Sequence, residues 1–391
     1  MSIDVQGAKL GFQFQTAAKR RKESSCRRIC KPLSALCLFG FNRGSKNTTT
    51  VTETTETKSD RDFSGRRNIL ASVFASSCLL AVAVGILGQQ TASERSVRLP
   101  DPLPIEYLQV QGLRRAVRFY VPERLADRPA LVLALHGGGG DGERFRRFTG
   151  TAFERLADRH GFVVAYPDAL GGQWNDCRTR APYHRALEGI DEIAFLRGVI
   201  RRAQVAAGRD LAGTFAAGYS NGGHLVFRLA FEAPQDFLAL AVIGAHLPVP
   251  SERACNSSGT PVSMFIASGT EDPINPWAGG EVQLHGVGTL GRVFSASQTV
   301  DYFRKLARIM GGPVIEQHAD RDAADGARVE TRRWVGREER EVVLMITYGG
   351  GHTLPHPGAQ FPAEVVGRTS RDIDGADEIW SFFARHLRRQ D

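Results

Sequence analysis

The stretch that decides the fold is Ala216-Ala-Gly-Tyr-Ser-Asn-Gly-Gly-His-Leu225, in which one serine stands between glycines. An apolar run that predicts a strand, Thr214–Gly218, leads into it, and a run that predicts a helix, Gly222–Phe231, leads out. Glycines two residues before and after Ser220 let a strand and a helix approach closely, so the serine occupies a tight turn with its hydroxyl exposed. Ser220 is therefore a candidate nucleophile, and an ordinary serine in a glycine-rich turn is the alternative.

On both sides of this turn, apolar strands alternate with amphipathic helices. The strands are expected at Glu106–Val110, Arg114–Tyr120, Ala130–Leu135, Phe162–Tyr166, Thr214–Gly218, Leu238–Ile243, Val262–Ala267 and Glu341–Thr347. Further helices are expected at Glu188–Ala207, Thr299–Met310 and Ile373–Leu387. This pattern is typical of the α/β class, with a mostly parallel central sheet and helices on both faces. Ligands of such sheets bind beyond the carboxyl ends of the strands, where residues 171–187 and 274–295 are loop-like.

A serine nucleophile needs a general base, and two histidines compete for this role. His352 ends the segment Tyr348-Gly-Gly-Gly-His352, directly after the last expected strand. His356 follows four residues later. We favour His352, because it is closer to the strand end and the glycines before it let it reach across the sheet edge.

The base in turn needs a carboxylate that orients it. Asp272 follows the strand Val262–Ala267, and Glu271 beside it is one residue out of phase. An Asx-turn before Pro273 is the purely structural alternative for Asp272. The order Ser220, Asp272, His352 is that of the α/β-hydrolase fold. These residues are the expected nucleophile, acid and base of an acyl transfer.

Two backbone N–H groups are candidates for binding the oxyanion that such a reaction forms. One belongs to Asn221, at the positive end of the helix after the serine. The other belongs to Gly138 or Gly137 in His136-Gly-Gly-Gly-Gly140, which follows an expected strand. Four glycines also suit a phosphate loop, but no Lys-Ser or Lys-Thr pair follows them. We therefore expect an oxyanion hole made by Gly138 and Asn221.

At these residues the chain resembles the polyhydroxybutyrate depolymerase-like and feruloyl esterase group of α/β-hydrolases, the LpqC-like secreted esterases. The resemblance spans roughly residues 105–388. It rests on ordered segments: Leu135-His-Gly-Gly-Gly139, Tyr166-Pro-Asp168, Trp174-Asn-Asp-Cys177, Asp191-Glu-Ile-Ala-Phe-Leu196, Gly218-Tyr-Ser-Asn-Gly-Gly223, Gly269-Thr-Glu-Asp-Pro-Ile-Asn-Pro-Trp-Ala-Gly-Gly280, Gly350-Gly-His-Thr353 and Ile379-Trp-Ser-Phe-Phe-Ala-Arg-His386. It implies an enzyme that hydrolyses carboxylic esters: hydroxybutyrate oligomers, or feruloyl and acetyl esters of polysaccharides.

Departures from the family pattern gather around the expected pocket. Glu192 and Ala194 replace an Asp and a Gly, Gly138 stands where many relatives carry Cys, and His224 stands where an apolar residue is common. These changes concern the substrate more than the reaction. Trp174 and Trp277 are expected to bind substrate by stacking on a ring, and packing roles are their alternative. A peptidase, a thioesterase, or a catalytically silent hydrolase used as a binding protein are the alternatives for the whole chain.

The N-terminal part differs from the rest in charge. The net charge is +8, and residues 1–68 contain 14 Lys and Arg against 6 Asp and Glu, so the remainder has 36 of each. The basic residues thus belong to a tail and not to a folded face, and we expect no nucleic-acid partner.

The domain boundaries follow from this charge pattern and from one apolar run. We expect residues 1–68 to be a basic targeting tail and residues 89–104 a linker. The catalytic domain is expected at residues 105–391. Residues 69–88 are uncharged and follow Arg66-Arg67, which predicts an export signal or a membrane anchor. The protein is therefore expected to be extracellular or periplasmic, with a membrane tether through residues 69–88 left open.

Two of the six cysteines, Cys177 and Cys255, fall in the expected catalytic domain. In an oxidising compartment they are able to form a disulfide, and two isolated buried thiols are the alternative. No spacing of His, Cys, Asp or Glu is typical of a metal site. We expect neither a metal nor another cofactor.

Overall fold

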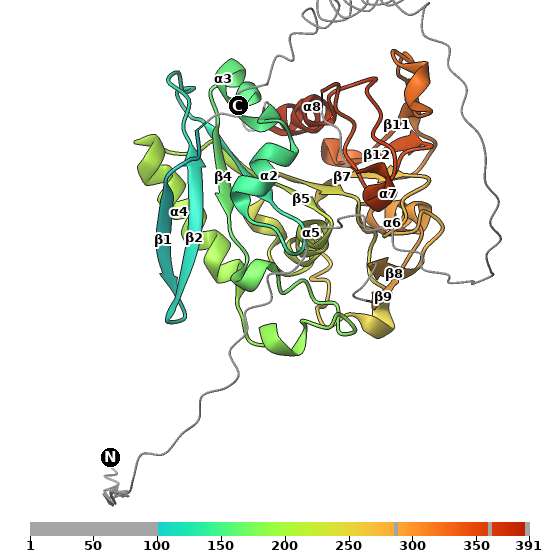
Figure 1. Cartoon of the computed structure of the whole chain (residues 1–391). Helices are drawn as coiled ribbons and strands as arrows, with labels where there is room; N and C mark the ends of the chain where they lie inside the picture. The colour runs from blue at the N-terminus through green and yellow to red at the C-terminus, as the bar shows by residue number, and fades with distance from the viewer. Residues whose placement is uncertain (1–100, 285–287, 359–361, 388–391) are drawn as a thin grey trace, which may run out of the picture. The chain divides into compact units, whose positions relative to one another are not determined.

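The computed structural model describes residues 101–284, 288–358 and 362–387 (Figure 1). Among these residues, ten strands form one sheet in the order β1-β2-β4-β3-β5-β6-β7-β12-β11-β10. The strands are β1 Ile105–Val110, β2 Leu113–Tyr120, β3 Ala130–Leu135, β4 Val163–Pro167, β5 Gly213–Tyr219, β6 Ala239–Ile243, β7 Ser263–Gly269, β10 Val314–Gln317, β11 Arg328–Val335 and β12 Glu341–Tyr348. Strands β8, Gly280–Leu284, and β9, Gly288–Val293, form a separate hairpin.

The central strands are parallel and the outer ones antiparallel. From β4 through β3, β5, β6 and β7 to β12, every neighbouring pair is parallel. Strands β1 and β2 on one side, and β11 and β10 on the other, pair antiparallel. This strand order, with helices on both faces of a mostly parallel sheet, is that of an α/β-hydrolase, so the predicted fold class is confirmed. Strand β5, which leads to Ser220, lies in the middle of the sheet.

Helices cover both faces of the sheet, because successive side chains of each buried strand point to opposite faces. On β3, Leu131, Leu133 and Leu135 belong to one apolar core, and the residues between them belong to the other. The first core is covered by α4 Glu192–Ala207, α5 Asn221–Glu232 and α6 Ala296–Leu306. The second is covered by α2 Gly142–Phe148, α3 Ala152–His160 and α8 Gly375–Leu387 (Figure 1).

The sequence pattern missed several elements. Residues 274–295, expected to be a loop, contain the hairpin β8–β9. Strand β11, Arg-Val-Glu-Thr-Arg-Arg-Trp-Val, is too charged to resemble a buried strand, yet it pairs along its whole length with β12. It tolerates the charges because it lies near the sheet edge, where one face meets water. The short helix α7, Ala363–Val366, was also not predicted.

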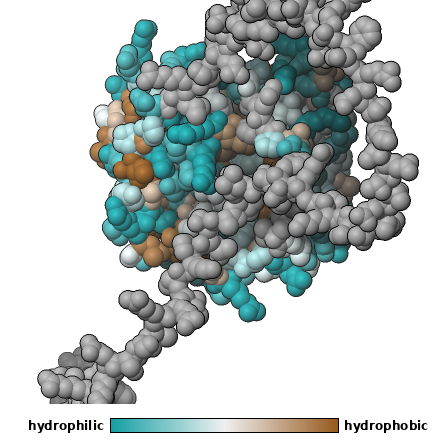
Figure 2. Space-filling view, viewed as in Figure 1, coloured by the Kyte–Doolittle hydropathy of each residue, from teal (hydrophilic) through white to brown (hydrophobic). Residues whose placement is uncertain are grey.

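The surface offers scattered apolar side chains. Figure 2 shows brown residues interspersed with teal ones on the side where β1 and α4 lie. The exposed apolar side chains there include Ile105, Tyr107 and Val205. The guanidinium of Arg114 stacks on the Tyr107 ring, 3.5 Å from its centroid, and so shields part of this edge strand from water.

The expectations for residues 1–68, 69–88 and most of the linker 89–104 lie outside the described residues. In the part of the chain that the structure describes, no helix is long and apolar enough to cross a membrane.

Candidate active site

Ser220 lies on a sharp turn between β5 and α5. Its backbone has φ 53° and ψ −114°, a conformation that non-glycine residues avoid and that costs about 1–3 kcal/mol. A Cβ on Gly218 would lie 2.2 Å from the Gly222 carbonyl oxygen, and one on Gly222 would lie 2.4 Å from that of Leu135. Both positions therefore require glycine. The close packing they allow imposes the strained turn and turns the serine side chain toward the pocket.

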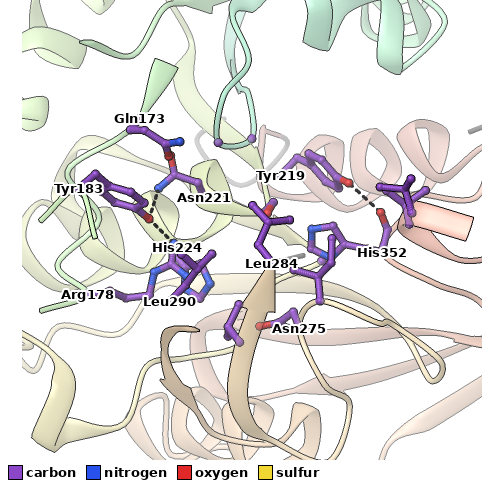
Figure 3. A pocket seen from close by; sticks show the side chains of 18 residues that line it. Gln173, Arg178, Tyr183, Tyr219, Asn221, His224, Asn275, Leu284, Leu290 and His352 are labelled. Carbon is purple, nitrogen blue, oxygen red and sulfur yellow. Dashed lines mark hydrogen bonds between the residues drawn. The ribbon is translucent and has the colours of Figure 1, made fainter. Parts of the chain in front are cut away.

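The structure brings His352 and Asp272 together in a buried contact at the carboxyl ends of neighbouring strands. His352 Nδ1 lies 2.7 Å from Asp272 Oδ2. The backbone N–H groups of Ile274 and Asn275 both donate to Asp272 Oδ1 at 2.8 Å, which fixes the carboxylate plane. The Tyr219 hydroxyl donates to the His352 carbonyl oxygen at 2.7 Å (Figure 3). The loop that carries His352 is thus tied to the residue next to Ser220.

The competing residues lie elsewhere. His356 does not line the pocket that contains Ser220, and its Nε2 lies 3.9 Å from Asp374. Glu271 is an exposed side chain whose carboxylate pairs with Arg368 at 3.0 Å. The side chains of His356 and Glu271 thus pair with Asp374 and Arg368, whereas those of His352 and Asp272 pair with each other.

The His136 ring stabilises the loop that carries Gly137 and Gly138 through two hydrogen bonds. The His136 Nε2 accepts a hydrogen bond from the Ala169 N–H at 2.9 Å, which leaves Nδ1 to donate to the Gly137 carbonyl at 2.7 Å. Burial lowers the pKa of His136, in keeping with a neutral ring in these two roles. Both glycines line the pocket with Ser220, and a Cβ on Gly137 would lie 3.4 Å from the Ser220 Cβ.

A buried polar network that sequence reasoning missed ties α5 to the loop beside the pocket. The Asn221 side chain accepts from the Trp174 N–H at 2.8 Å and donates to Asp176 Oδ2 at 2.6 Å. Asp176 also binds the Arg178 guanidinium at 2.6 Å and the Tyr183 hydroxyl at 3.0 Å. Asp176 and Arg178 are both 2 % exposed. Only the polar run around the expected cysteine, Asn175-Asp176-Cys177-Arg178, hinted at it in the sequence.

Cys177 and Cys255 form a disulfide, with their Cα atoms 5.5 Å apart. It joins the loop of this network to the segment before β7. Within the described residues, the group of side chains close enough to share a metal ion is Cys177, Glu232 and Cys255. Since the disulfide consumes both thiols, this group has no thiolate to offer a metal.

Trp174 and Trp277, which were expected to bind substrate, are not among the residues that line the pocket with Ser220. Trp174 is completely buried in the core, and its indole N–H donates to the His136 carbonyl at 2.8 Å. Its role is to support the loop that carries Gly137 and Gly138. Trp277 packs against the same core, and its carbonyl accepts from the Ala296 N–H at the start of α6.

The pocket around Ser220 has a volume of about 230 Å³. It lies between the loops after β3, β5 and β12 and is closed by residues from the hairpin β8–β9 and from α7. Its apolar walls are Ile274, Val282, Leu284, Leu290, Val365 and Val366. Residues 171–187 and 274–295, which were expected to line the cleft, both contribute to it. The pocket therefore admits a small and largely apolar group next to the serine.

His246 is a buried histidine near Asp272. Its titration leads to a prediction of how the free energy of unfolding depends on pH. His246 is fully buried, and its Nε2 lies 2.8 Å from Ser268 Oγ. Burial, partly opposed by Asp272, lowers the pKa of His246 to about 4 from 6.5. Between these values only the unfolded chain binds the proton, so stability is lost as the pH falls from 6.5 to about 4. The loss amounts to about 3 kcal/mol at 1.36 kcal/mol per pKa unit.

Urea unfolding at a series of pH values measures this dependence. The variant His246→Gln is expected to show a shallower fall in unfolding free energy across pH 6.5–4 than the wild type. The variant His184→Gln, at a histidine that is only partly buried, serves as the control and keeps the wild-type slope. An unchanged slope in His246→Gln would show that this histidine is not the group responsible.

The network around Asp176 predicts a large loss of stability on mutation. Asp176→Ala would leave the Arg178 guanidinium buried without a counter-ion, which costs about 3–5 kcal/mol. The matched control is Asp236→Ala, which breaks a partly exposed pair with Arg197 and is expected to cost less than about 1 kcal/mol. Urea titration measures the free energy of unfolding of both variants. Equal and small decreases of this free energy in the two variants would contradict the prediction.

The chain is similar in sequence to proteins named as esterases. No family model matches the chain. The chain is 29% identical over 287 residues to the putative esterase NocK of Nocardia uniformis subsp. tsuyamanensis, covering 70% of this chain and 80% of that protein. It is 25% identical over 238 residues to feruloyl esterase B of Neurospora crassa, covering 60% and 78%.

Among solved structures, the acetyl xylan esterase of Aspergillus awamori matches with a TM-score of 0.45 at 17% identity, covering 65% of this chain and 95% of that one. The fold itself follows from the strand order above. The esterase names of the relatives support the expectation that the chain is an enzyme, a carboxylic ester hydrolase.

Proposed function

We propose that the chain is a serine esterase that hydrolyses carboxylic esters through an acyl-enzyme on Ser220. The observation that carries the proposal is the buried contact of His352 Nδ1 with Asp272 Oδ2, in the same pocket as a serine on a strained turn. With Nδ1 engaged by the carboxylate, Nε2 is the nitrogen that is free to take a proton from the serine.

The reaction has two halves. His352 Nε2 takes the proton of Ser220 Oγ as the oxygen attacks the ester carbonyl, and the N–H groups of Gly138 and Asn221 stabilise the oxyanion. His352 then gives the proton to the leaving alcohol, and an acyl ester remains on Ser220. Water, deprotonated by His352, attacks this ester and releases the acid, and the proton returns to Ser220. Asp272 holds the imidazole in the required tautomer throughout.

The substrates fall in one of two groups: hydroxybutyrate oligomers, or feruloyl and acetyl esters of polysaccharides. The names of the relatives, feruloyl esterase and acetylxylan esterase, support the second group. The resemblance to polyhydroxybutyrate depolymerase-like enzymes supports the first. The small volume of the pocket supports a small acyl group, such as hydroxybutyryl in the first group or acetyl in the second.

Covalent labelling tests the proposal directly. The full chain is incubated with a fluorophosphonate, and in parallel with p-nitrophenyl acetate, methyl ferulate and a hydroxybutyrate trimer. We expect a single adduct, mapped by mass spectrometry to the peptide that contains Ser220, and hydrolysis of at least one ester that the label abolishes. Hydrolysis of none of the esters together with no adduct would overturn the proposal.

We further propose that the protein works outside the cytoplasm, in the extracellular space or the periplasm. The disulfide between Cys177 and Cys255 supports this placement, because such bonds persist in oxidising compartments. Fractionation of the producing cells tests it. Protein found only in the cytoplasmic fraction would overturn it.

A further inference from the structure

We propose that the pocket beside Ser220 contains a polar subsite, formed by His224 and Asn275 with Gln173 near Gly138, that binds a hydroxyl group of the substrate. The inference rests on the proposed function and deepens it. It names the class of ester: one whose group next to the reacting carbonyl carries a hydroxyl.

The subsite consists of buried polar groups that the protein leaves unpaired. His224 is 2 % exposed and Asn275 is 0 % exposed, and both line the pocket. Among the described residues, His224 Nδ1, both side-chain polar atoms of Asn275 and Gln173 Oε1 have no hydrogen-bond partner. A buried polar atom without a partner costs about 1–3 kcal/mol. Four such atoms in one pocket therefore destabilise the folded protein. A ligand that forms hydrogen bonds with them removes this destabilisation and gains binding free energy.

The backbones of His224 and Asn275 are both bound to residues of the proposed mechanism. The backbone N–H of His224 donates to the Ser220 carbonyl at 2.9 Å. The His224 side chain therefore lies one helical turn from the nucleophile, with about 5–6 Å between the two Cβ atoms. The Asn275 N–H donates to Asp272 Oδ1 at 2.8 Å. Figure 3 shows these side chains and Gln173 around the same pocket. The unpaired side chains therefore line the same pocket as Ser220.

Gln173 lies against the loop that is proposed to bind the oxyanion. Its Oε1 is 2.8 Å from the position that a Cβ on Gly138 would occupy. Only a glycine at that position leaves room for the carboxamide, so a residue with a side chain there would displace it. The Gln173 carboxamide thus lies beside the backbone of Gly138.

The other polar groups in the pocket wall are already engaged. The Tyr183 hydroxyl and the Arg178 guanidinium both bind Asp176, and the Asn221 side chain binds Asp176 and Trp174. The Tyr219 hydroxyl donates to the His352 carbonyl, and Ser220 and His352 are reserved for the proposed reaction. The remaining side chains of the wall are apolar. A hydroxyl that enters the pocket therefore finds its partners at His224, Asn275 and Gln173.

The chemistry of these groups fits a neutral hydroxyl. Burial lowers the pKa of His224 well below its ordinary value, with smaller contributions from Arg178, His246 and His352. The neutral ring has one donor and one acceptor nitrogen, and the Asn275 carboxamide also donates and accepts. A hydroxyl donates one hydrogen bond and accepts up to two, so these groups satisfy it. A carboxylate or an ammonium group would be buried there without a counter-charge, which is costly.

The experiment compares esters that differ only in a hydroxyl, on the full chain. One pair, methyl 3-hydroxybutyrate and methyl butyrate, tests a hydroxyl on the acyl side. The other, 2-hydroxypropyl acetate and propyl acetate, tests the alcohol side. We expect kcat/KM to be at least about tenfold higher for the hydroxylated member of one pair. The preferred pair identifies the side of the ester that enters the subsite.

Variants then assign the preference to the subsite. His224→Met keeps the side-chain volume nearly constant, and Asn275→Leu keeps the branched shape with the same number of heavy atoms. In both variants the ratio of kcat/KM within the preferred pair is expected to fall about tenfold, toward one. His224→Gln, which keeps polar atoms in place, is expected to retain part of the ratio. Leu290→Met changes the apolar wall of the same pocket and serves as the control, with the ratio unchanged.

Stability separates this role from a structural one. Replacement of the unpaired Asn275 side chain by Leu is expected to leave the melting temperature unchanged or to raise it by about 2–4 °C. The inference is overturned if the wild type hydrolyses esters without preferring a hydroxylated one, or if the preference survives both variants. If the wild type hydrolyses no ester at all, the proposed function fails and this inference falls with it.

Discussion

Ser220→Ala is expected to reduce kcat for ester hydrolysis by roughly 10⁴–10⁶-fold, and to abolish labelling by fluorophosphonate. The physical reason is that the acyl-enzyme requires a nucleophilic oxygen at this turn, and the methyl group of alanine has none. The backbone turn at position 220 is expected to stay unchanged in the alanine variant, because the close contacts of Gly218 and Gly222 with neighbouring backbone impose it. The variant should therefore fold like the wild type.

The measurement is the initial rate on p-nitrophenyl acetate, with circular dichroism spectra and melting temperature recorded for each protein. Ser381→Ala, on the exposed surface of α8, is the matched control and is expected to keep the wild-type rate. A Ser220→Ala enzyme that retains a tenth or more of the wild-type rate would refute the role of this serine. Another residue of the chain would then have to be the nucleophile.

Asp272→Asn is expected to reduce kcat by about 10⁴-fold while the protein remains folded. In the native site, Asp272 Oδ1 accepts two backbone N–H groups and Oδ2 contacts His352 Nδ1. An asparagine oxygen would keep the two backbone donors, so its NH₂ group would face Nδ1 and donate to it. The imidazole would then carry its proton on Nε2, where it is no longer able to accept the proton of Ser220.

Glu271→Gln is the control for this prediction. Glu271 is the adjacent carboxylate, but it is exposed and paired with Arg368, so its loss should change kcat less than about threefold. Stopped assays on p-nitrophenyl acetate over the linear range measure both variants. If Glu271→Gln were the more damaging of the two, the assignment of the orienting carboxylate would be wrong.

The sequence predicted the central part of the fold because the parallel strands are buried on both faces. Continuous apolar runs such as Ala130–Leu135 are hard to mistake for anything else of that length. The elements it missed are those whose burial is one-sided or partial. Strand β11 is rich in arginine and gains its stability from pairing with β12 and not from its own pattern. The hairpin β8–β9 contains several glycines and was therefore interpreted as a loop.

For the site, the sequence named the residues that the structure brings together but not what supports them. Ser220, Asp272 and His352 stand at strand ends, and strand ends of a parallel sheet meet at one edge, so their proximity follows from the pattern. The roles of the two tryptophans could not be decided from the sequence, because an aromatic residue in a loop is typical both of a binding surface and of a core. Only packing shows that Trp174 is completely buried, with its indole N–H bound to the His136 carbonyl.

By itself the sequence determined the order of strands and helices, the turn at Ser220 and the chemical groups available near it. These depend on local spacing and on which residues tolerate a strained turn, and such information is contained in short segments. The tertiary structure alone decided which histidine meets which carboxylate, which cysteines join, and which polar side chains remain unpaired in the pocket. Those outcomes depend on contacts between residues such as Asn221 and Asp176, or Asp272 and His352, which are far apart in the chain and are brought together only when the sheet has formed.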